Sequence, residues 1–342
     1  MNERIKRFVN WRTLTALLLM LLCIIMLCMS CKPRMEWFKM EGMTFGTTYH
    51  ITYQYKMEQD SVVKRQLERI DNALSLFNDK STLARLNRGE TVEIDSLFIA
   101  VFEKGMEVSQ ATGGCFDMTV APLVNLWGFG RDEKSMDNID SLRVVADSLK
   151  NIVGYEKCKL VVDGDSMKLV GGTVDAAAIA KGFACDVVAK ALKTNGCENF
   201  CVEIGGEVVV CGNNPRGEKW RIGINTPEDG NLNDVEEALS LTDCGMATSG
   251  NYRNFYKMGD VKVAHTIDPR QGMPVATDIL SATIVADDCM TADAWATACM
   301  VAGLKEAVGW MMEHKELKAY LITRKGDEFK MTIVENGEMK KW

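Results

Sequence analysis

The sequence predicts an α+β fold. Its strand-like and helical segments follow one another in mixed order, without the sustained strand–helix–strand alternation of a doubly wound parallel sheet. No G-x-G-x-x-G motif follows an expected strand, so a Rossmann dinucleotide site is not predicted. With 342 residues, of which 47% are hydrophobic, the chain is long enough to bury a large core.

The charge is distributed unevenly. The formal net charge is -7, yet residues 1–31 carry Arg4, Lys6, Arg7 and Arg12 against Glu3, a net +3 that leaves -10 for residues 32–342. Proteins that coat nucleic-acid phosphates need basic surface, and no basic stripe with interleaved aromatic residues occurs here. The composition therefore argues against nucleic acid as a partner.

The N-terminal segment has the pattern of a secretion signal. Its basic start precedes an apolar run at 14–27, which is shorter than the ~20 residues that span a bilayer. Ser30 before Cys31 resembles a bacterial lipobox, so we expect a signal peptide at 1–30, lipidation of Cys31 and a tether at 31–41. An uncleaved single anchor is the alternative. Both place the body on the extracytoplasmic (periplasmic) side of a membrane, and we expect the inner membrane.

Nine cysteines follow Cys31. Their odd number and the lack of a C-x-x-C pair fit neither a zinc site nor a regular disulfide framework. We expect most to be buried as small apolar side chains, while a bond from Cys197 to Cys201 or Cys211 stays open.

The first half of the body combines strands with amphipathic helices. Residues 43–53 alternate around Gly46 like a strand, and in 60–77 apolar residues recur at spacings of three and four, which predicts a core-facing helix. The following segments are a loop and short helix at 75–87, a helix at 96–112, a glycine- and aromatic-rich stretch at 113–130, a surface excursion at 132–139, a helix at 141–153, and strands at 158–162 and 167–170.

The second half begins with a strand expected to run through very small residues into a helix at 174–186. Such a helix start exposes unpaired N–H groups and suits a phosphate. Gly205-Gly206 interrupts a strand at 200–211 and permits close backbone approach. The remaining predictions are a strand at 220–225, a surface loop at 226–234, polar turn-containing segments at 246–253 and 265–272, a strand at 280–286, helices at 291–298 and 305–314, and a hairpin of 319–323 with 329–334.

The helix at 291–298 carries a notable polar pair. Asp293 and Thr297 are four residues apart, so their oxygen atoms lie on one helix face. The pair suits a small hard cation, and the neighbouring alanines allow close approach of a ligand. The same pair also fits a buried helix whose polar groups are satisfied locally, and two ligands are not a complete site.

Eight stretches in one consistent order over 42–330 resemble the FAD:protein FMN transferases, the ApbE-type flavin transferase family. They are Gly46-Thr47, 77–87, Phe116-Asp117 with 122–130, Val174-Asp175 with Lys181-Gly182, Gly205-Gly206, 248–253, 265–269, and 292–294 with Thr297. The resemblance implies a transferase domain at 42–335 made of two intimately packed halves of mixed or antiparallel sheet with helices. FAD would lie in a cleft between the halves, with Mg2+ beside its pyrophosphate.

The resemblance also implies roles for individual residues. Asp293 and Thr297 match the family's side-chain metal ligands. Ala178 lies where a backbone oxygen completes the set of metal ligands that the protein supplies. Judged without the resemblance, Lys181 also fits a solvated helix position and Asp175 a helix cap. The positions expected to contact FAD are Phe45, Phe77, Cys115, Phe116, Asp117, Asp175, Lys181 and Ile267.

The implied reaction transfers FMN from FAD to a threonine hydroxyl of an acceptor protein, a subunit of a membrane redox complex, and releases AMP. We assign His265 as the general base, because an imidazole titrates near neutral pH and this one lies in a turn with Asp268. A purely structural histidine is the alternative. Two further functions stay open: an FAD pyrophosphatase that gives FMN and AMP, and a non-catalytic FAD-binding lipoprotein.

Overall fold

The computed structural model describes residues 11, 13–22, 34–130, 138–225, 235–251, 255–258, 261–325 and 328–341. One compact unit comprises Met1–Glu36 with Tyr55–Glu58, and a second comprises Trp37–Gln54 with Gln59–Trp342. In the first unit, residues 13–22 are helical. Among the described residues, no helix combines the length and apolar character needed to cross a membrane. Cys31 and most of the predicted signal peptide lie outside the described residues, as do 131–137 and 226–234.

The second unit is organised around one nine-stranded sheet, with the order β1-β2-β6-β7-β10-β15-β16-β17-β18. Every neighbouring pair from β2 to β18 is antiparallel. This sheet, with the helices described below, confirms the predicted α+β class. The strands are β1 (Glu36–Thr44), β2 (Thr47–Tyr55), β6 (Asn199–Ile204), β7 (Glu207–Cys211), β10 (Cys244–Gly250), β15 (Ile279–Ala286), β16 (Lys318–Lys325), β17 (Glu328–Glu335) and β18 (Glu338–Lys341).

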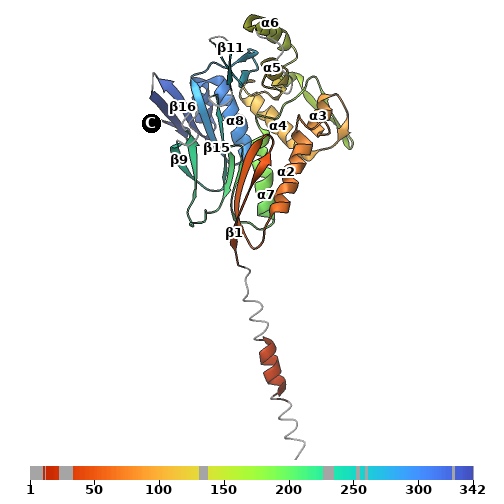
Figure 1. Ribbon diagram of the computed structural model, residues 1–342, viewed down its shortest axis with the longest axis vertical. Helices are drawn as coiled ribbons and strands as arrows, with labels where there is room; N and C mark the ends of the chain where they lie inside the picture. The colour runs from red at the N-terminus through yellow and green to blue at the C-terminus, as the bar shows by residue number, and fades with distance from the viewer. Residues whose placement is uncertain are drawn as a thin grey trace, which may run out of the picture. The chain divides into compact units, whose positions relative to one another are not determined.

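Helices cover one face of this sheet. Helix α8 packs on β10 and β15, α7 packs on α8 and on β6 and β7, and α2 packs on α7 (Figure 1). The helices are α2 (Asp60–Leu74), α3 (Thr82–Asn87), α4 (Ser96–Ala111), α5 (Ala121–Leu126), α6 (Ile139–Leu149), α7 (Ala180–Thr194), α8 (Cys289–Ala302) and α9 (Leu304–Glu313), with short 3-10 turns at Met118–Val120 and Tyr155–Lys157.

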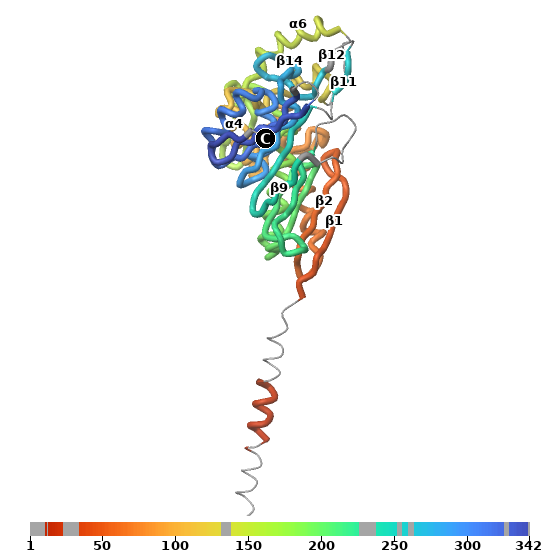
Figure 2. The backbone as a smooth tube through the Cα atoms, turned by 90° about the vertical axis from the view of Figure 1, so that its left-hand side faces the viewer, coloured from red at the N-terminus to blue at the C-terminus, as the bar shows by residue number. Residues whose placement is uncertain are grey.

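Small sheets complete the unit. The pair β8 (Trp220–Asn225) and β9 (Val235–Leu241) packs through Trp220, Ile224 and Leu239 on side chains from the main sheet. Figure 2 shows α6 with β11, β12 and β14 gathered at one end of the unit. The other strands are β3 (Val92–Glu93), β5 (Ser166–Val170) and β4 (Lys159–Asp163) in one sheet, β11 (Phe255–Met258) with β12 (Val261–Ala264), and β13 (Ile267–Asp268) with β14 (Met273–Pro274).

The folded unit starts earlier than the predicted boundary at residue 42. Strand β1 begins at Glu36, so 36–41 are strand residues, although the sequence assigned them to a tether. The aromatic side chains explain the difference, because Phe38 stacks on Tyr53 with ring centroids 5.5 Å apart and Trp37 meets Trp220 edge-on at 6.1 Å. The first pair joins the adjacent strands β1 and β2, and the second joins β1 to β8 of a separate sheet.

Two local predictions were wrong. Residues 174–176 form no strand; they lead into a turn at 177–179 before α7. The polar segment expected at 246–253 is instead largely strand β10, in the middle of the main sheet. Its polar side chains fit there because Thr248 shares a 2.8 Å hydrogen bond with Thr283 on the paired strand. Cross-strand hydroxyl pairs of this kind let a polar sequence occupy a central strand.

Helix α2 ends at Leu74, three residues before the predicted end. The hydroxyl of Ser75 accepts hydrogen bonds from the N–H groups of Phe77 and Asn78, and such local bonds compete with continuation of a helix. All nine cysteines after Cys31 are free thiols, so the structure contains no bond from Cys197 to Cys201 or Cys211.

Candidate active site

A cavity of about 610 Å³ opens where β6, β7 and β10 meet the starts of α7 and the 3-10 turn at Met118–Val120. It is lined by most of the residues that the sequence assigned to the site. These are His265, Cys115, Phe116, Asp117, Asp175, Lys181, Ile267, Ala178, Asp293 and Thr297. The sequence positions therefore converge on one enclosed space, although they lie as much as 182 residues apart, from Cys115 to Thr297.

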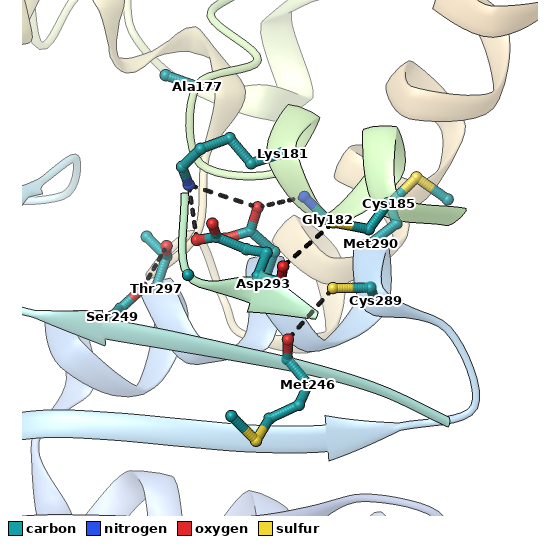
Figure 3. A network of polar contacts seen from close by, with 12 residues as sticks. Ala177, Lys181, Gly182, Cys185, Met246, Ser249, Cys289, Met290, Asp293 and Thr297 are labelled. Carbon is teal, nitrogen blue, oxygen red and sulfur yellow. Dashed lines mark hydrogen bonds and ion pairs between the residues drawn. The ribbon is translucent and has the colours of Figure 1, made fainter. Parts of the chain in front are cut away.

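One side, which we call the α7–α8 wall, is formed by Lys181, Asp293 and Thr297 (Figure 3). Glu207 of β7 lies beside Lys181. The N–H of Gly182 donates to Oδ2 of Asp293 over 3.0 Å. A helix N-terminus stabilises an anion in this position. The sequence analysis predicted that the N–H groups at this helix start suit a phosphate. The N–H of Gly182 instead binds the protein's own carboxylate, that of Asp293.

Close contact between the two helices explains why Gly182 has no side chain. A Cβ there would lie 2.3 Å from the carbonyl oxygen of Cys289 and 2.8 Å from Cβ of Asp293. Asp186, one helical turn further along α7, accepts hydrogen bonds from the N–H groups of Cys289 (2.9 Å) and Met290 (2.8 Å). These contacts fix the start of α8 against α7 and so position Asp293.

Three charges meet at this wall. Nζ of Lys181 donates to Oε1 of Glu207 over 2.7 Å and lies 3.9 Å from Oδ2 of Asp293. Burial disfavours a charged lysine, but Asp293 and Glu207 outweigh burial and hold the pKa of Lys181 above its usual value. Burial raises the pKa of Glu207 to about 7, although Lys181 acts in the opposite direction. Oε2 of Glu207 is buried and has no hydrogen-bond partner among the described residues.

The donor set suits a small hard cation. The cavity is lined by the carboxylate of Asp293, the hydroxyl of Thr297 and residue Ala178, and Ser249 on β10 lies 3.3 Å from Thr297, hydroxyl to hydroxyl. Within the described residues no group of three or more His, Cys, Asp or Glu side chains could hold a metal. Mg2+ does not need such a group, because it retains waters and uses substrate phosphates as ligands. The residues present therefore fit Mg2+ better than a transition metal.

A second part of the lining, which we call the Asp117 wall, is formed by Cys115, Phe116, Asp117 and Asp175. Oδ1 of Asp117 accepts hydrogen bonds from the N–H and the hydroxyl of Thr119, both at 2.7 Å, and Oδ2 accepts one from the N–H of Tyr155 at 2.8 Å. Burial still raises the pKa of Asp117. This carboxylate holds the wall together through its own protein partners.

Asp175 joins the same wall. Its N–H donates to the carbonyl of Met118 over 2.7 Å, and its Oδ1 accepts from the N–H of Ala177 over 2.7 Å. Helix α7 begins only at Ala180, so Asp175 closes a turn before the helix and is not its N-cap. Burial raises the pKa of the Cys115 thiol to about 11, so this group stays neutral.

His265 also lines the cavity, and its ring lies edge-on to Phe129 with centroids 6.2 Å apart. The neighbouring Ile267 is buried. The carboxylate of Asp268, in the same turn as His265, accepts hydrogen bonds from Arg270 and Gln271. The turn is thus held by Asp268.

Phe45 and Phe77 do not line this cavity. Phe77 is 77% exposed in the loop after α2. Phe45 and Gly46 form the turn between β1 and β2 with φ of 50° and 73°, a conformation unusual for phenylalanine. This turn is close to the site, because Thr48 accepts a hydrogen bond from Gly205, a cavity residue. Contact of either ring with FAD stays a prediction.

Sequence reasoning missed Glu207, Asp186 and Ser249. Glu207 directly follows Gly205-Gly206, where an acidic residue fits an exposed turn equally well. Asp186 did leave a signal: Lys181, Gly182, Cys185 and Asp186 share one face of a helix at spacings of one, four and five. That face contacts α8.

The ApbE family model matches residues 45–321. A Vibrio cholerae protein named FAD:protein FMN transferase is 33% identical over 94% of this chain and 96% of its own length, and a Haemophilus influenzae protein of that name is 32% identical over 88% and 90%.

Solved structures agree. The flavin transferase ApbE from Vibrio cholerae has a TM-score of 0.77 at 31% identity, covering 89% of this chain and 99% of its own. The apo form of the Pseudomonas stutzeri flavinyl transferase ApbE has a TM-score of 0.74 at 29% identity, covering 89% and 95%.

Proposed function

Because the chain belongs to the ApbE family, we propose that it is an FAD:protein FMN transferase that uses Mg2+ to move FMN from FAD onto a threonine of an acceptor protein. The acceptor is a subunit of a membrane redox complex, and the second product is AMP. The relatives' shared name supports the transferase activity. The cation rests on the donor set of the site, and the threonine acceptor and AMP rest on the resemblance to the family.

The observation that carries the proposal is the α7–α8 wall. It places a carboxylate, a hydroxyl and an ammonium group on one side of a cavity of about 610 Å³. Asp293, Thr297 and the backbone of Ala178 would hold Mg2+, which when bound neutralises charge on phosphate oxygens. Lys181 adds a second positive charge at the same wall, 2.7 Å from Glu207 and 3.9 Å from Asp293, which would favour a bound pyrophosphate.

The remaining steps fall to other residues of the chain. The threonine hydroxyl oxygen forms a bond to the phosphorus of the FMN half, the bond from that phosphorus to the AMP phosphate oxygen breaks, and AMP leaves with the electron pair. His265 accepts the hydroxyl proton at a ring nitrogen. Asp117 and Asp175 stabilise the Asp117 wall by accepting hydrogen bonds from Thr119, Tyr155 and Ala177.

The test is a reaction of the full chain with FAD, Mg2+ and a purified acceptor subunit. Mass spectrometry of acceptor peptides should show added FMN on one threonine, and chromatography should show an equal amount of AMP. An acceptor with that threonine replaced by valine and a reaction with EDTA are the controls. Release of FMN and AMP without labelled acceptor would show a pyrophosphatase, and binding of FAD without turnover would show a non-catalytic flavoprotein; either contradicts the proposal.

We also propose that Cys31 carries lipid and anchors the protein on the extracytoplasmic face of the inner membrane. The apolar run at 14–27 and the Ser30-Cys31 pair support this. Cells fed a labelled fatty acid should label the wild-type chain and leave Cys31→Ser unlabelled. Label on both chains, or on neither, would contradict the anchor without affecting the transferase proposal.

A further inference from the structure

Glu207 is a buried carboxylate that the proposed reaction does not use. Glu207 is 4% exposed. Its Oε1 accepts the hydrogen bond from Lys181, and its Oε2 has no hydrogen-bond partner among the described residues. Buried polar atoms are nearly always paired, and an unpaired one lowers stability. A carboxylate kept in this state calls for an explanation beyond packing.

The position of the Lys181 ammonium supplies one. It lies between two carboxylates, 2.7 Å from Oε1 of Glu207 and 3.9 Å from Oδ2 of Asp293. Both partners attract it, and the attraction falls with distance, so the shorter contact holds it. Without Glu207, the remaining buried anion beside Lys181 would be Asp293.

The lysine stem fixes the same arrangement. A Cβ on Gly205 would lie 3.2 Å from Cδ of Lys181 and 2.9 Å from Cγ2 of Thr47, so the stem passes over a position that only glycine leaves open. Cys185, one turn along α7, donates its S–H to the carbonyl of Glu207 over 3.2 Å. Helix α7 and the start of β7 are therefore held together on both sides of the ion pair.

Charge then decides what Asp293 can bind. While Lys181 pairs with Glu207, the carboxylate of Asp293 accepts the Gly182 N–H and keeps negative charge for another cation. If Lys181 paired with Asp293, its ammonium would neutralise that carboxylate and repel a divalent ion. The same three groups thus favour or oppose a divalent cation according to which carboxylate holds the lysine.

We propose that Glu207 is a positioning residue that holds the Lys181 ammonium away from Asp293 and so keeps Asp293 available for a divalent cation. The inference rests on the proposed function for the presence of that cation. It assigns Glu207 no contact with the cation or with FAD.

The test measures Mn2+ binding to the full chain by electron paramagnetic resonance, without FAD, so that the readout is independent of turnover. Glu207→Ala should bind Mn2+ about 10-fold or more weakly than wild type, in the range typical for loss of a residue that orients a ligand. Glu207→Gln keeps an acceptor for Lys181 and loses the charge, so its affinity should be intermediate.

The decisive variant combines Glu207→Ala with Lys181→Met. If Glu207 acts by holding the lysine, removing the lysine as well should restore most of the lost affinity. Equal loss with or without Lys181 would overturn the proposal, because Glu207 would then bind the cation directly or support the fold. Unchanged affinity in both Glu207 variants would overturn it too. Glu207→Gln, close to isosteric, keeps the test valid if Glu207→Ala does not fold. Absence of Mn2+ binding by wild type would count against the cation of the proposed function itself.

Discussion

The α7–α8 wall and the Asp117 wall both carry carboxylates beside the same cavity, but they use their oxygen atoms differently. Both carboxylate oxygens of Asp117 accept hydrogen bonds from the protein, two from Thr119 and one from Tyr155. In the α7–α8 wall, Asp293 accepts one N–H, from Gly182, and Glu207 leaves one oxygen unpaired. The fold satisfies both oxygens of Asp117, whereas the α7–α8 wall keeps oxygen capacity for a cation.

This contrast separates structural from functional carboxylates without reference to their sequence. Burial raises the pKa of both Asp117 and Glu207, so a perturbed pKa alone does not distinguish them. The number of hydrogen bonds that each carboxylate accepts from the protein distinguishes them. We therefore expect substitution of Asp293 to weaken cation binding more than stability, and substitution of Asp117 to lower stability more than cation binding.

The largest effect is expected for Asp293→Asn. The amide oxygen can still accept the Gly182 N–H, so the fold should stay close to wild type, but the charge proposed to hold Mg2+ is lost. FMN transfer should fall about 100-fold or more, as when one strong electrostatic contact to a reacting group is removed. Initial rates with saturating FAD and Mg2+ measure this. Activity within threefold of wild type would show that Asp293 is not a cation ligand.

Gly182→Ala should damage the α7–α8 wall through packing. Its Cβ would meet the backbone of Cys289 at 2.3 Å, so the helices must separate. Overpacking of this kind costs about 1–3 kcal/mol of unfolding free energy. Gly309→Ala in α9 is the matched control, because nothing lies within 4 Å of its Cβ and alanine should stabilise the helix by about 0.5–1 kcal/mol. Urea unfolding compares them, and equal stability of the two variants would argue against tight helix contact.

Asp117→Ala should have the reverse profile of Asp293→Asn. It removes three hydrogen bonds and leaves buried N–H groups unpaired, which costs about 1–3 kcal/mol. Mn2+ affinity should change by less than about twofold, since both oxygens of Asp117 already accept hydrogen bonds from the protein. If Asp117→Ala weakened Mn2+ binding as much as Asp293→Asn, the distinction between the walls would fail.

Asp186→Asn tests the smallest effect, through pH. Burial raises the pKa of Asp186 from 3.8 to about 7. Because the folded-state pKa lies above the unfolded one, the folded protein binds more protons between about pH 4 and 7, so its unfolding free energy falls as pH rises through that window. Asparagine does not titrate, so the fall in unfolding free energy across this window should be smaller than in wild type by at least about 1.4 kcal/mol, the value of one pKa unit. Parallel curves for both proteins would contradict the assignment.

The sequence by itself determined most of the elements and the identity of the polar groups. Apolar spacing located α2, and Gly205-Gly206, predicted as an interruption within one strand, forms with φ of 66° and 102° the turn between β6 and β7. These features are local: a helix face and a glycine turn depend on neighbours within a few residues. The end of α2 was missed because it depends on one side chain, Ser75, bonding to the following backbone.

The tertiary structure alone decided which carboxylates are satisfied. Asp117 and Asp293 look alike in sequence, each an aspartate next to small or apolar residues. Their difference comes from donors 38 and 111 residues away, Tyr155 and Gly182, and from the absence of a side chain at Gly182 that lets α8 approach. Glu207 became visible for the same reason, because its pairing with Lys181 exists only when β7 lies beside α7. Hydrogen bonds and charges act over a few ångströms in space, and the sequence does not record which residues come that close.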